Sequence, residues 1–456
     1  MKYLQFFRRG FQKQLSQEWL LILSFAGIIF LGTLLLMLPI SCTGDSLSFI
    51  DALFTATSAT CVTGLSVVDT GTKFTLFGQI TILVLIQLGG LGITVFSIAL
   101  LYLFERQLSL TRRDMLSEVL NQGPTQNLTE LLKTVFIGTF FIEAVGAFLL
   151  TYAFSKSMPW DEALYSGIFH SISAYCNAGF GLHPDNLIRY QGDVLVNFTI
   201  CMLIVFGGLG FVVLYEIHRL IKQHSFRLSY HSRLVLLVSS TLILSGAIFF
   251  FILEKNTLLK NMPWKTKILV SLFQSITTRT AGFNTVDIAM LSNPTIFLFI
   301  LYMFIGGSPA SCAGGIKTTT FTVILASIRA RFHNQEETHF LSRKIPGDIV
   351  SKSITITFFS GMCIILGSIL LLITEENTLD LSKNRGQFLE LLFEATSASG
   401  TVGLSMGITA SLSVLGKLLI TLLMFIGRLG PLTITAAIGK QEKLSYHYAT
   451  EEILVG

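Results

Sequence analysis

The sequence predicts an all-α integral membrane protein made of four copies of one unit, in which a half-spanning helix and a re-entrant loop separate two spanning helices. Two observations lead to this prediction. The 456 residues are 51% hydrophobic and only 13% charged, which is more apolar surface than a soluble globular domain can bury. Apolar stretches of spanning length also recur along the chain, and a repeated pattern lies between successive pairs of them.

About eight stretches are long and apolar enough to cross a bilayer. In chain order they cover residues 19–40, 75–104, 131–155, 194–217, 233–253, 295–328, 352–374 and 411–438. We interpret the first as a span rather than a signal peptide, because no small-residue cleavage site follows it. Lys and Arg are more frequent on the side of the two termini, so the positive-inside rule predicts that both termini are cytoplasmic. This topology explains the net charge of +5 without a nucleic-acid partner.

The spans group into four repeats between two terminal segments. We predict repeats at residues 19–104, 131–220, 230–332 and 349–439, with cytoplasmic segments at 1–18 and 440–456. The third repeat is expected to have a broken second helix. The six cysteines show no CxxC pair and no repeated ligand spacing, so neither a disulfide framework nor a zinc site is expected.

One motif recurs in all four outer segments: a Phe, a Ser/Thr-rich turn, and a glycine followed by a bulky apolar residue. The copies are FTATSATCVTGL (from Phe54), FHSISAYCNAGF (from Phe169), FQSITTRTAGF (from Phe273) and FEATSASGTVGL (from Phe393). A second glycine motif follows each copy at nearly constant distance, as IQLGGLG, VFGGLGF, FIGGSPA and FIGRLGP. Close helix packing explains a single glycine pair, but four such glycine motifs in register with four loops indicate a functional repeat.

The chemistry of these loops favours a cation. Irregular backbone at membrane depth is tolerated only where it is buried in protein or lines a water-filled cavity, so four such loops imply a shared polar axis. Each short helix points the negative end of its dipole at that axis. The loop glycines permit positive φ, so that backbone carbonyls can face inward and replace the hydration shell of K⁺. Thr401-Val402-Gly403 repeats the start of the TVGYG filter of potassium channels. The predicted K⁺-binding filter residues are Val62, Thr63, Gly64, Asn177, Ala178, Gly179, Thr280, Ala281, Gly282, Thr401, Val402 and Gly403.

The loops and their glycine motifs resemble the superfamily of potassium transporters that includes the Trk, Ktr and plant HKT proteins. In that superfamily, four M1–pore loop–M2 units in one chain surround a pseudo-fourfold pore. The chain is most similar to the membrane subunit of bacterial Ktr potassium-uptake systems, because the short segment before its first span leaves no room for the extra helix pair of Trk-type subunits.

The resemblance implies potassium uptake across the inner membrane of a bacterium. It also implies a homodimer in membrane lipid, with one pore per protomer and a cytoplasmic ring of RCK regulatory subunits. An adenine nucleotide is expected on that partner and no cofactor in this chain, where K⁺ is the transported ion and Na⁺ a candidate activator. Glycine in all four loops points to K⁺ rather than Na⁺ by the pattern of the HKT relatives.

The sixth predicted span contains GGSPASCAGGIK, in which four glycines and a proline cannot maintain a regular helix. The resemblance implies that this break is an intramembrane gate below the filter. The predicted gate residues are Gly306, Gly307, Ser308, Pro309, Ala310, Ser311, Cys312, Ala313, Gly314 and Gly315.

Arg428 stands where the first three repeats have the second glycine of the pair, and a charge at that depth is costly unless it is paired. The resemblance implies that it is a second gate residue, and we expect its guanidinium to donate to carbonyls of the loop. The alternative is a packing pair with a carboxylate such as Glu143, whose role the sequence leaves open. Arg279 is interpreted as an arginine of the outer mouth that either holds the third loop or sets the electrostatics of entry.

Two alternative functions remain from the sequence. One is the potassium-translocating subunit of an ATP-driven pump, which shares the four-loop plan, and the other is a Na⁺-coupled or Na⁺-permeable transporter of the same fold. An intramembrane enzyme is disfavoured, since the chain has neither a GxSxG nucleophile elbow nor an HExxH motif.

Overall fold

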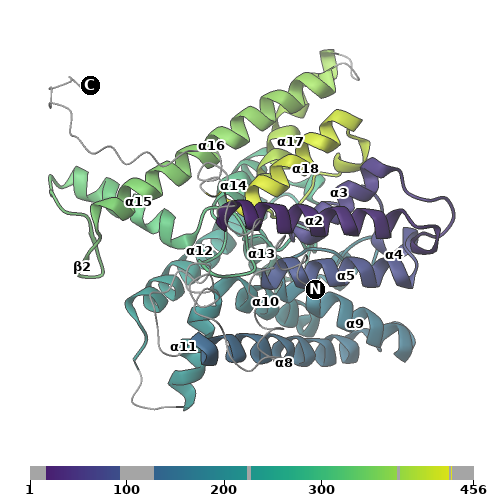
Figure 1. Ribbon diagram of the computed structural model, residues 1–456, viewed down its shortest axis with the longest axis horizontal. Helices are drawn as coiled ribbons and strands as arrows, with labels where there is room; N and C mark the ends of the chain where they lie inside the picture. Colours follow the sequence, from purple (N-terminus) through teal and green to yellow (C-terminus); the bar gives the residue numbers. More distant parts are fainter. Residues whose placement is uncertain (1–16, 93–127, 223–226, 377–380, 431–432, 434–456) are drawn as a thin grey trace, which may run out of the picture.

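Four helical units surround a common centre in the computed structural model (Figure 1). The structure describes residues 17–92, 128–222, 227–376, 381–430 and 433. The predicted terminal segments lie almost entirely outside these residues. Within them, the secondary structure is helical apart from one two-stranded hairpin.

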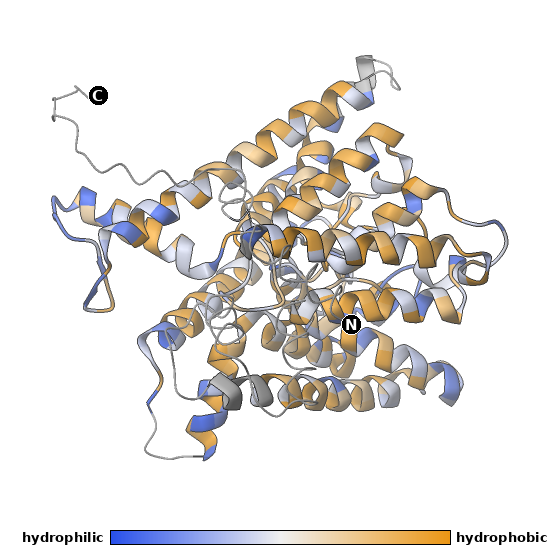
Figure 2. Ribbon diagram, in the orientation of Figure 1, coloured by the Kyte–Doolittle hydropathy of each residue, from blue (hydrophilic) through white to orange (hydrophobic). Residues whose placement is uncertain are grey.

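Each unit has the same three parts. The first helices are α2 (Gln17–Met37), α8 (Leu128–Phe154), α12 (Tyr230–Glu254) and α16 (Gly347–Glu376). These four are long and apolar enough to cross a membrane, and they are predominantly orange in Figure 2. The half-spanning helices are α3 (Phe49–Thr60), α9 (Trp160–Tyr175), α13 (Trp264–Thr277) and α17 (Leu381–Gly400). The second helices are α5 (Leu76–Leu91), α10 (Val194–Leu209), α14 (Asn293–Phe304) and α18 (Val414–Leu429).

The remaining elements connect these parts. They are η1 (Pro39–Ser41), α4 (Thr70–Lys73), η2 (Ile188–Tyr190), α11 (Phe211–Lys222), η3 (Ile288–Met290), α15 (Thr318–Phe332), β1 (His339–Phe340), β2 (Arg343–Lys344) and η4 (Thr409–Ser411). The antiparallel hairpin β1–β2 follows α15, and the Tyr230 hydroxyl at the start of α12 donates to the Phe340 carbonyl over 2.8 Å. The hairpin is therefore fixed to α12 and α15 of the third unit.

The units form a closed ring. The second helix of each unit packs against the half-spanning helix of the next, in the pairs α5 with α9, α10 with α13 and α14 with α17, and α18 with α3 closes the circle. An ion pair of 2.8 Å joins Lys417 on α18 to Asp51 on α3 at this last contact. The pattern gives the four half-spanning helices equivalent places around one axis.

The second helices are interrupted more widely than the sequence analysis predicted. The expected continuous span 194–217 is wrong, because α10 ends at Leu209 and the chain turns by 105° into α11. Gly210 at this turn has φ +95°, and the equivalent Gly92 and Gly430 have φ +80° and +82°. Each is the last glycine of its motif and ends its helix with a positive φ, which glycine adopts without a steric penalty. The third unit has Pro309 at that position and breaks at residues 305–317 instead. The residues directly after Gly92 and Gly430 lie outside the described part of the chain.

Buried carboxylates hold the second helices of the third and fourth units. Glu254 at the end of α12 accepts hydrogen bonds from the Ser292 backbone N–H (3.0 Å), the Ser292 hydroxyl (2.7 Å) and the Thr295 hydroxyl (2.6 Å) at the start of α14. Glu375 on α16 accepts in the same way from Ser413 at the start of α18. A carboxylate is suited to this place because it accepts hydrogen bonds from the free N–H groups of a helix N-terminus. The positive end of the helix dipole also stabilises its negative charge.

We expect Glu254→Ala to lower the free energy of unfolding of the detergent-solubilised protein by about 3 kcal/mol, because it leaves several buried donors without an acceptor. The measurement is the unfolding midpoint followed by intrinsic fluorescence. Glu162→Ala on the exposed start of α9 is the matched control and should be close to neutral. Equal midpoints for the two variants would contradict the anchoring role of Glu254.

Candidate functional site

Four backbone segments with the same conformation meet at the centre of the ring. In each loop the residue two places before the motif glycine has positive φ: Val62 (57°), Asn177 (58°), Thr280 (64°) and Thr401 (49°). The glycines Gly64, Gly179, Gly282 and Gly403 also have positive φ, between 71° and 96°. The residues between them do not, so the sign of φ alternates along each loop. Such alternation turns successive carbonyls toward one side. The residues other than glycine adopt their positive φ only at an energetic cost.

The glycines form a closed ring in which each touches the next loop. A Cβ on Gly64 would lie 2.4 Å from the Ala178 carbonyl oxygen. The same contact joins Gly179 to the Ala281 oxygen (2.9 Å), Gly282 to the Val402 oxygen (2.8 Å) and Gly403 back to the Thr63 oxygen (2.0 Å). Every Cβ would therefore collide with a carbonyl of the neighbouring loop. The ring demands glycine both for its positive φ and for this close approach.

Hydroxyl groups of the half-spanning helices hold the loops in place, and the sequence analysis did not single them out. The Ser58 and Ser397 hydroxyls accept hydrogen bonds from the N–H groups of Gly64 and Gly403, both over 3.1 Å. The Ser173 and Thr277 hydroxyls instead donate to the carbonyls that follow the other two glycines. All four are the fifth residue of their motif, counted from the Phe. The signal was therefore present as an aligned Ser/Thr column.

Two hydroxyls at the positive-φ positions of the ring have no partner among the described residues. The Oγ1 atoms of Thr280 and Thr401 are buried and make no hydrogen bond there. Both belong to the positive-φ position that precedes the ring glycine by two residues. A buried oxygen without a donor is expensive in a sealed core but is suited to coordinating a cation.

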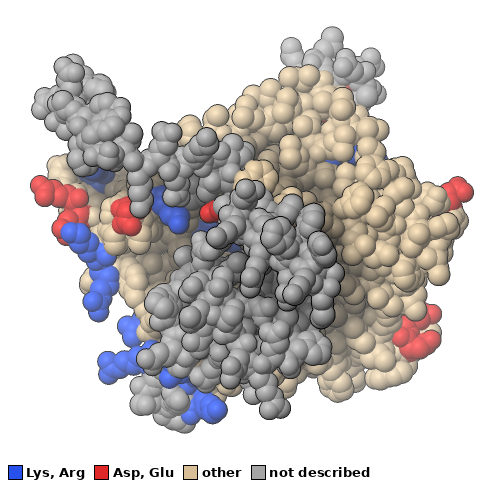
Figure 3. Space-filling model, in the orientation of Figure 1, with Lys and Arg blue, Asp and Glu red and all other residues tan. Residues whose placement is uncertain are grey.

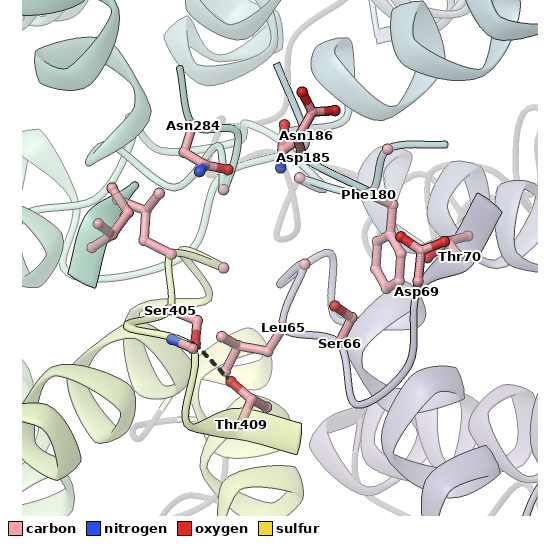
Figure 4. A pocket seen from close by; sticks show the side chains of 18 of the residues that line it. Leu65, Ser66, Asp69, Thr70, Phe180, Asp185, Asn186, Asn284, Ser405 and Thr409 are labelled. Atoms are coloured by element: carbon pink, nitrogen blue, oxygen red, sulfur yellow. Dashed lines mark hydrogen bonds between the residues drawn. The ribbon is translucent and has the colours of Figure 1, made fainter. Parts of the chain in front are cut away.

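An outer cavity of about 310 Å³ leads to the glycine ring. Figure 4 shows that loops from all four units line it, among them the segments that carry Leu65, Phe180, Asn284 and Ser405. The carboxylates of Asp69, Asp185 and Asp287 lie in its wall and favour cations there. Burial, and then the nearby Arg189 guanidinium, lower the pKa of His183 in the same wall to about 4. The imidazole is therefore neutral at pH 7 and does not oppose a cation.

The predicted gate segment lies directly below the ring. A Cβ on Gly314 would lie 2.0 Å from the Thr401 Oγ1 and 3.0 Å from the Gly400 carbonyl oxygen. The segment returns on itself, since the Gly306 N–H donates to the Ile316 carbonyl over 2.9 Å. The loop thus occupies the inner end of the central axis, where the fourth loop begins.

The gate segment satisfies its backbone on the end of α10. The Cys312 and Ser308 N–H groups donate to the Gly207 and Gly208 carbonyls over 3.1 and 3.0 Å, and the Phe211 N–H donates to the Ala310 carbonyl over 2.7 Å. A helix that ends within the membrane leaves its last carbonyls free. The break after α10 therefore supplies the acceptors that this irregular segment needs at membrane depth.

Arg428 joins the gate segment to the first unit. Its Nη1 donates to the Cys312 carbonyl, and its Nη2 donates to the carbonyls of Gly89 and Gly90 at the end of α5. The contact with the loop that the sequence predicted is present. The two α5 carbonyls belong to the negative end of a helix dipole, which stabilises the guanidinium.

Comparison with known proteins gives the family. The family model described as TrkH, cation transport protein, matches residues 13–446. The chain belongs to this family. It is 41% identical to the Ktr system potassium uptake protein B of Bacillus subtilis, with 96% of each chain covered. It is 34% identical to the potassium/sodium uptake protein NtpJ of Enterococcus hirae, over 98% of this chain and 99% of the relative.

The fold agrees with that assignment. The crystal structure of the potassium transporter TrkH from Vibrio parahaemolyticus matches with a TM-score of 0.70 at 17% identity, covering 92% of this chain and 83% of that one. The chain is therefore a multi-pass membrane protein of a cation transport family, and its relatives are transporters rather than enzymes.

Two earlier interpretations of buried charges in this TrkH-family chain are wrong: the alternative pair of Arg428 with Glu143, and the expected position of Arg279 at the outer mouth. Glu143 does not pair with Arg428, because its carboxylate accepts from the Gln87 amide over 3.1 Å, between the first and second units. Arg279 does not lie at the outer mouth. It follows α13 and precedes the ring residue Thr280, so it lies at the inner end of its loop, where it is 8% exposed and donates to the Ser239 hydroxyl of α12 over 3.3 Å. The half-spanning helix runs inward from the outer side before the loop turns back outward. A residue at their junction therefore lies at the inner end of the loop, although the whole segment starts and finishes on the outer side.

Proposed function

We propose that this protein takes up K⁺ across a bacterial inner membrane through the pore at the centre of the four units. The closed ring of loop glycines, each against a carbonyl of the next loop, is the observation that carries the proposal. The names of the potassium uptake relatives support the choice of ion. Both chain ends would lie in the cytoplasm, as the distribution of Lys and Arg favours.

In this mechanism, K⁺ enters the outer cavity and loses water to the carbonyls of the predicted filter residues, with the Thr280 and Thr401 hydroxyls as further oxygen ligands. The segment from Gly306 to Gly315 and the Arg428 guanidinium then close the path below the filter. In the closed state, Arg428 and the gate segment are joined by a direct hydrogen bond. A cation meets both a steric barrier and a positive charge there.

A cytoplasmic RCK subunit that carries an adenine nucleotide would control this gate. Its point of action would be α15, which directly continues the gate segment and is followed by the exposed hairpin β1–β2. Withdrawing α15 would pull the segment away from Thr401, in the manner of a hinge. Na⁺ would act as an activator rather than as cargo.

Growth of a K⁺-uptake-deficient bacterium at limiting K⁺ tests the proposal. We expect the chain to restore growth, and more strongly when an RCK subunit of a Ktr system is supplied with it. A filter variant with intact membrane expression is the control. Failure of the parent chain to restore growth under either condition would contradict potassium uptake.

A Na⁺-permeable transporter is the second candidate, favoured by the relative named as a potassium/sodium uptake protein. Proteoliposome flux separates the two. We expect ⁸⁶Rb⁺ uptake that excess external K⁺ suppresses and excess Na⁺ does not. Equal suppression by both ions would favour the second candidate.

We also propose that the chain works as a homodimer in the membrane, as Ktr-type subunits do. Native mass measurement of the detergent-purified protein should then give about twice 50.3 kDa. A monomer with full transport activity would count against the dimer.

A further inference from the structure

Helix α11 lies across the end of the membrane domain instead of along it. It turns by 105° from α10, packs against α8, and crosses the view in Figure 1 near the start of that helix. The start of α8 belongs to the predicted cytoplasmic side. A helix in this orientation runs near the plane of the inner membrane surface.

The side chains of α11 divide into two faces. At 100° per residue, its apolar residues from Val213 onward occupy an arc of roughly 120°, and its polar residues occupy the opposite arc. The apolar arc contains Val213, Leu214, Ile217, Leu220 and Ile221, and the polar arc contains Tyr215, Glu216, His218, Arg219 and Lys222. Ile221 is 73% exposed and Leu220 is 39% exposed. Strong segregation with basic residues on the polar face is typical of helices that lie in a membrane interface.

The apolar arc borders an open groove of about 310 Å³. On one side the groove is lined by Leu214, Ile217 and Ile221 of α11. On the other it is lined by Val135, Gly138 and Phe141 of α8, and its deep end reaches Phe206 and Tyr175. It therefore leads from the membrane surface toward the middle of the bilayer. Its volume is at the lower end of the range of about 300–1,000 Å³ for ligand pockets.

Basic side chains lie beside this groove on the polar arc of α11, next to its lining residues Tyr215 and His218. His218 lines it directly, Lys222 is exposed one residue beyond Ile221, and the Arg219 guanidinium lies over the Tyr215 ring at 5.9 Å. The one carboxylate of α11, that of Glu216, accepts from the Ser229 N–H and is turned to the loop before α12. Figure 3 shows Lys and Arg side chains gathered at this end of the molecule.

We propose that the groove between α8, α10 and α11 binds one anionic phospholipid of the cytoplasmic leaflet. An acyl chain fills the groove along Val135, Phe141 and Phe206, and the phosphate lies against Arg219 and Lys222. The groove is apolar inside and has basic side chains beside it. Its ligand must therefore carry both an apolar chain and a negative charge, as an anionic phospholipid does. The site is independent of the ion that the pore conducts.

The bound lipid is next to the gate. The first residue of α11, Phe211, lines the groove and donates its N–H to the Ala310 carbonyl of the gate segment. A Cβ on the preceding Gly210 would lie 2.5 Å from the Pro309 carbonyl oxygen. The lipid thus supports the helix on which the gate segment is docked.

Gly138→Phe tests the acyl site, because a Cβ on Gly138 meets no atom within 4 Å and a larger side chain extends into the groove. Protein reconstituted with phosphatidylglycerol is re-extracted in mild detergent, and the lipid retained per chain is counted by native mass spectrometry. We expect the parent to retain phosphatidylglycerol and Gly138→Phe to lose at least about tenfold in apparent affinity. Gly361→Phe on α16, where a Cβ also meets nothing within 4 Å, is the matched control and should behave as the parent.

Arg219→Gln combined with Lys222→Gln tests the phosphate site. The preference for phosphatidylglycerol over phosphatidylcholine should fall by about fivefold per charge, whereas Lys255→Gln with Lys260→Gln on the outer side should leave it unchanged. Ile221→Gln, on an exposed position, repeats the acyl test if Gly138→Phe fails to fold. A parent that retains no lipid, as when a protein segment fills the groove, would overturn the proposal. So would equal retention by the parent, Gly138→Phe and Ile221→Gln.

Discussion

Gly403→Ser should strongly lower the discrimination between K⁺ and Na⁺. The new Cβ would lie 2.0 Å from the Thr63 carbonyl oxygen and 3.0 Å from the Gly64 Cα, so the first and fourth loops must move apart. Gly403 also has φ +90°, which serine adopts only under strain. Flux assays with ⁸⁶Rb⁺ against Na⁺ should show at least about a tenfold loss of selectivity, the equivalent of 1.4 kcal/mol. Gly64→Ser, with a 2.4 Å clash on the Ala178 oxygen, should act in the same direction.

Gly407→Ala is the matched control for this experiment. Gly407 has the same φ of +90°, a few residues beyond the ring, but a Cβ there meets no atom within 4 Å. It therefore carries the backbone strain without the collision. Selectivity should survive in Gly407→Ala and not in Gly403→Ser. Unchanged selectivity in both Gly403→Ser and Gly64→Ser would exclude these loops as the filter.

Arg428→Ala should raise K⁺ flux and weaken its dependence on the regulatory subunit. The substitution removes the hydrogen bond to the Cys312 carbonyl, frees the gate segment from α5, and takes away a positive charge below the ring. Deleting residues 311–313 should have the same effect by shortening the segment. Both are measured as flux with and without the RCK partner. Lys417→Ala is the control, since this charge on the same helix pairs with Asp51 away from the gate.

The two gate changes should be less than additive when combined. Either one already removes the contact between Arg428 and Cys312, and residues that share a contact couple by about 0.5–3 kcal/mol. Full additivity would mean that the arginine and the segment act separately. If both variants reached the membrane and conducted no faster than the parent, the contact would be structural, and the gate would lie elsewhere.

Local sequence was sufficient to predict the fold class, the four-fold repeat and the family resemblance. These depend on properties that local sequence carries: apolar length reports a membrane span, and the aligned glycines report loops that need positive φ. The same alignment contained the Ser/Thr column of Ser58, Ser173, Thr277 and Ser397, whose hydroxyls proved to hold the loops. It also contained the final glycines Gly92, Gly210 and Gly430 that end three of the second helices.

Which buried groups contact one another depends on the packing of the helices. The partner of Glu143 is Gln87 rather than Arg428, and the Arg279 side chain reaches Ser239 rather than the outer mouth. The acceptors for the gate segment and for Arg428 are the last carbonyls of α10 and α5, which exist only because those helices end within the membrane. A hydrogen bond between distant segments depends on the depth and direction of both. The periodicity of one segment carries no information about where another segment ends, so the packed ring alone could settle these contacts.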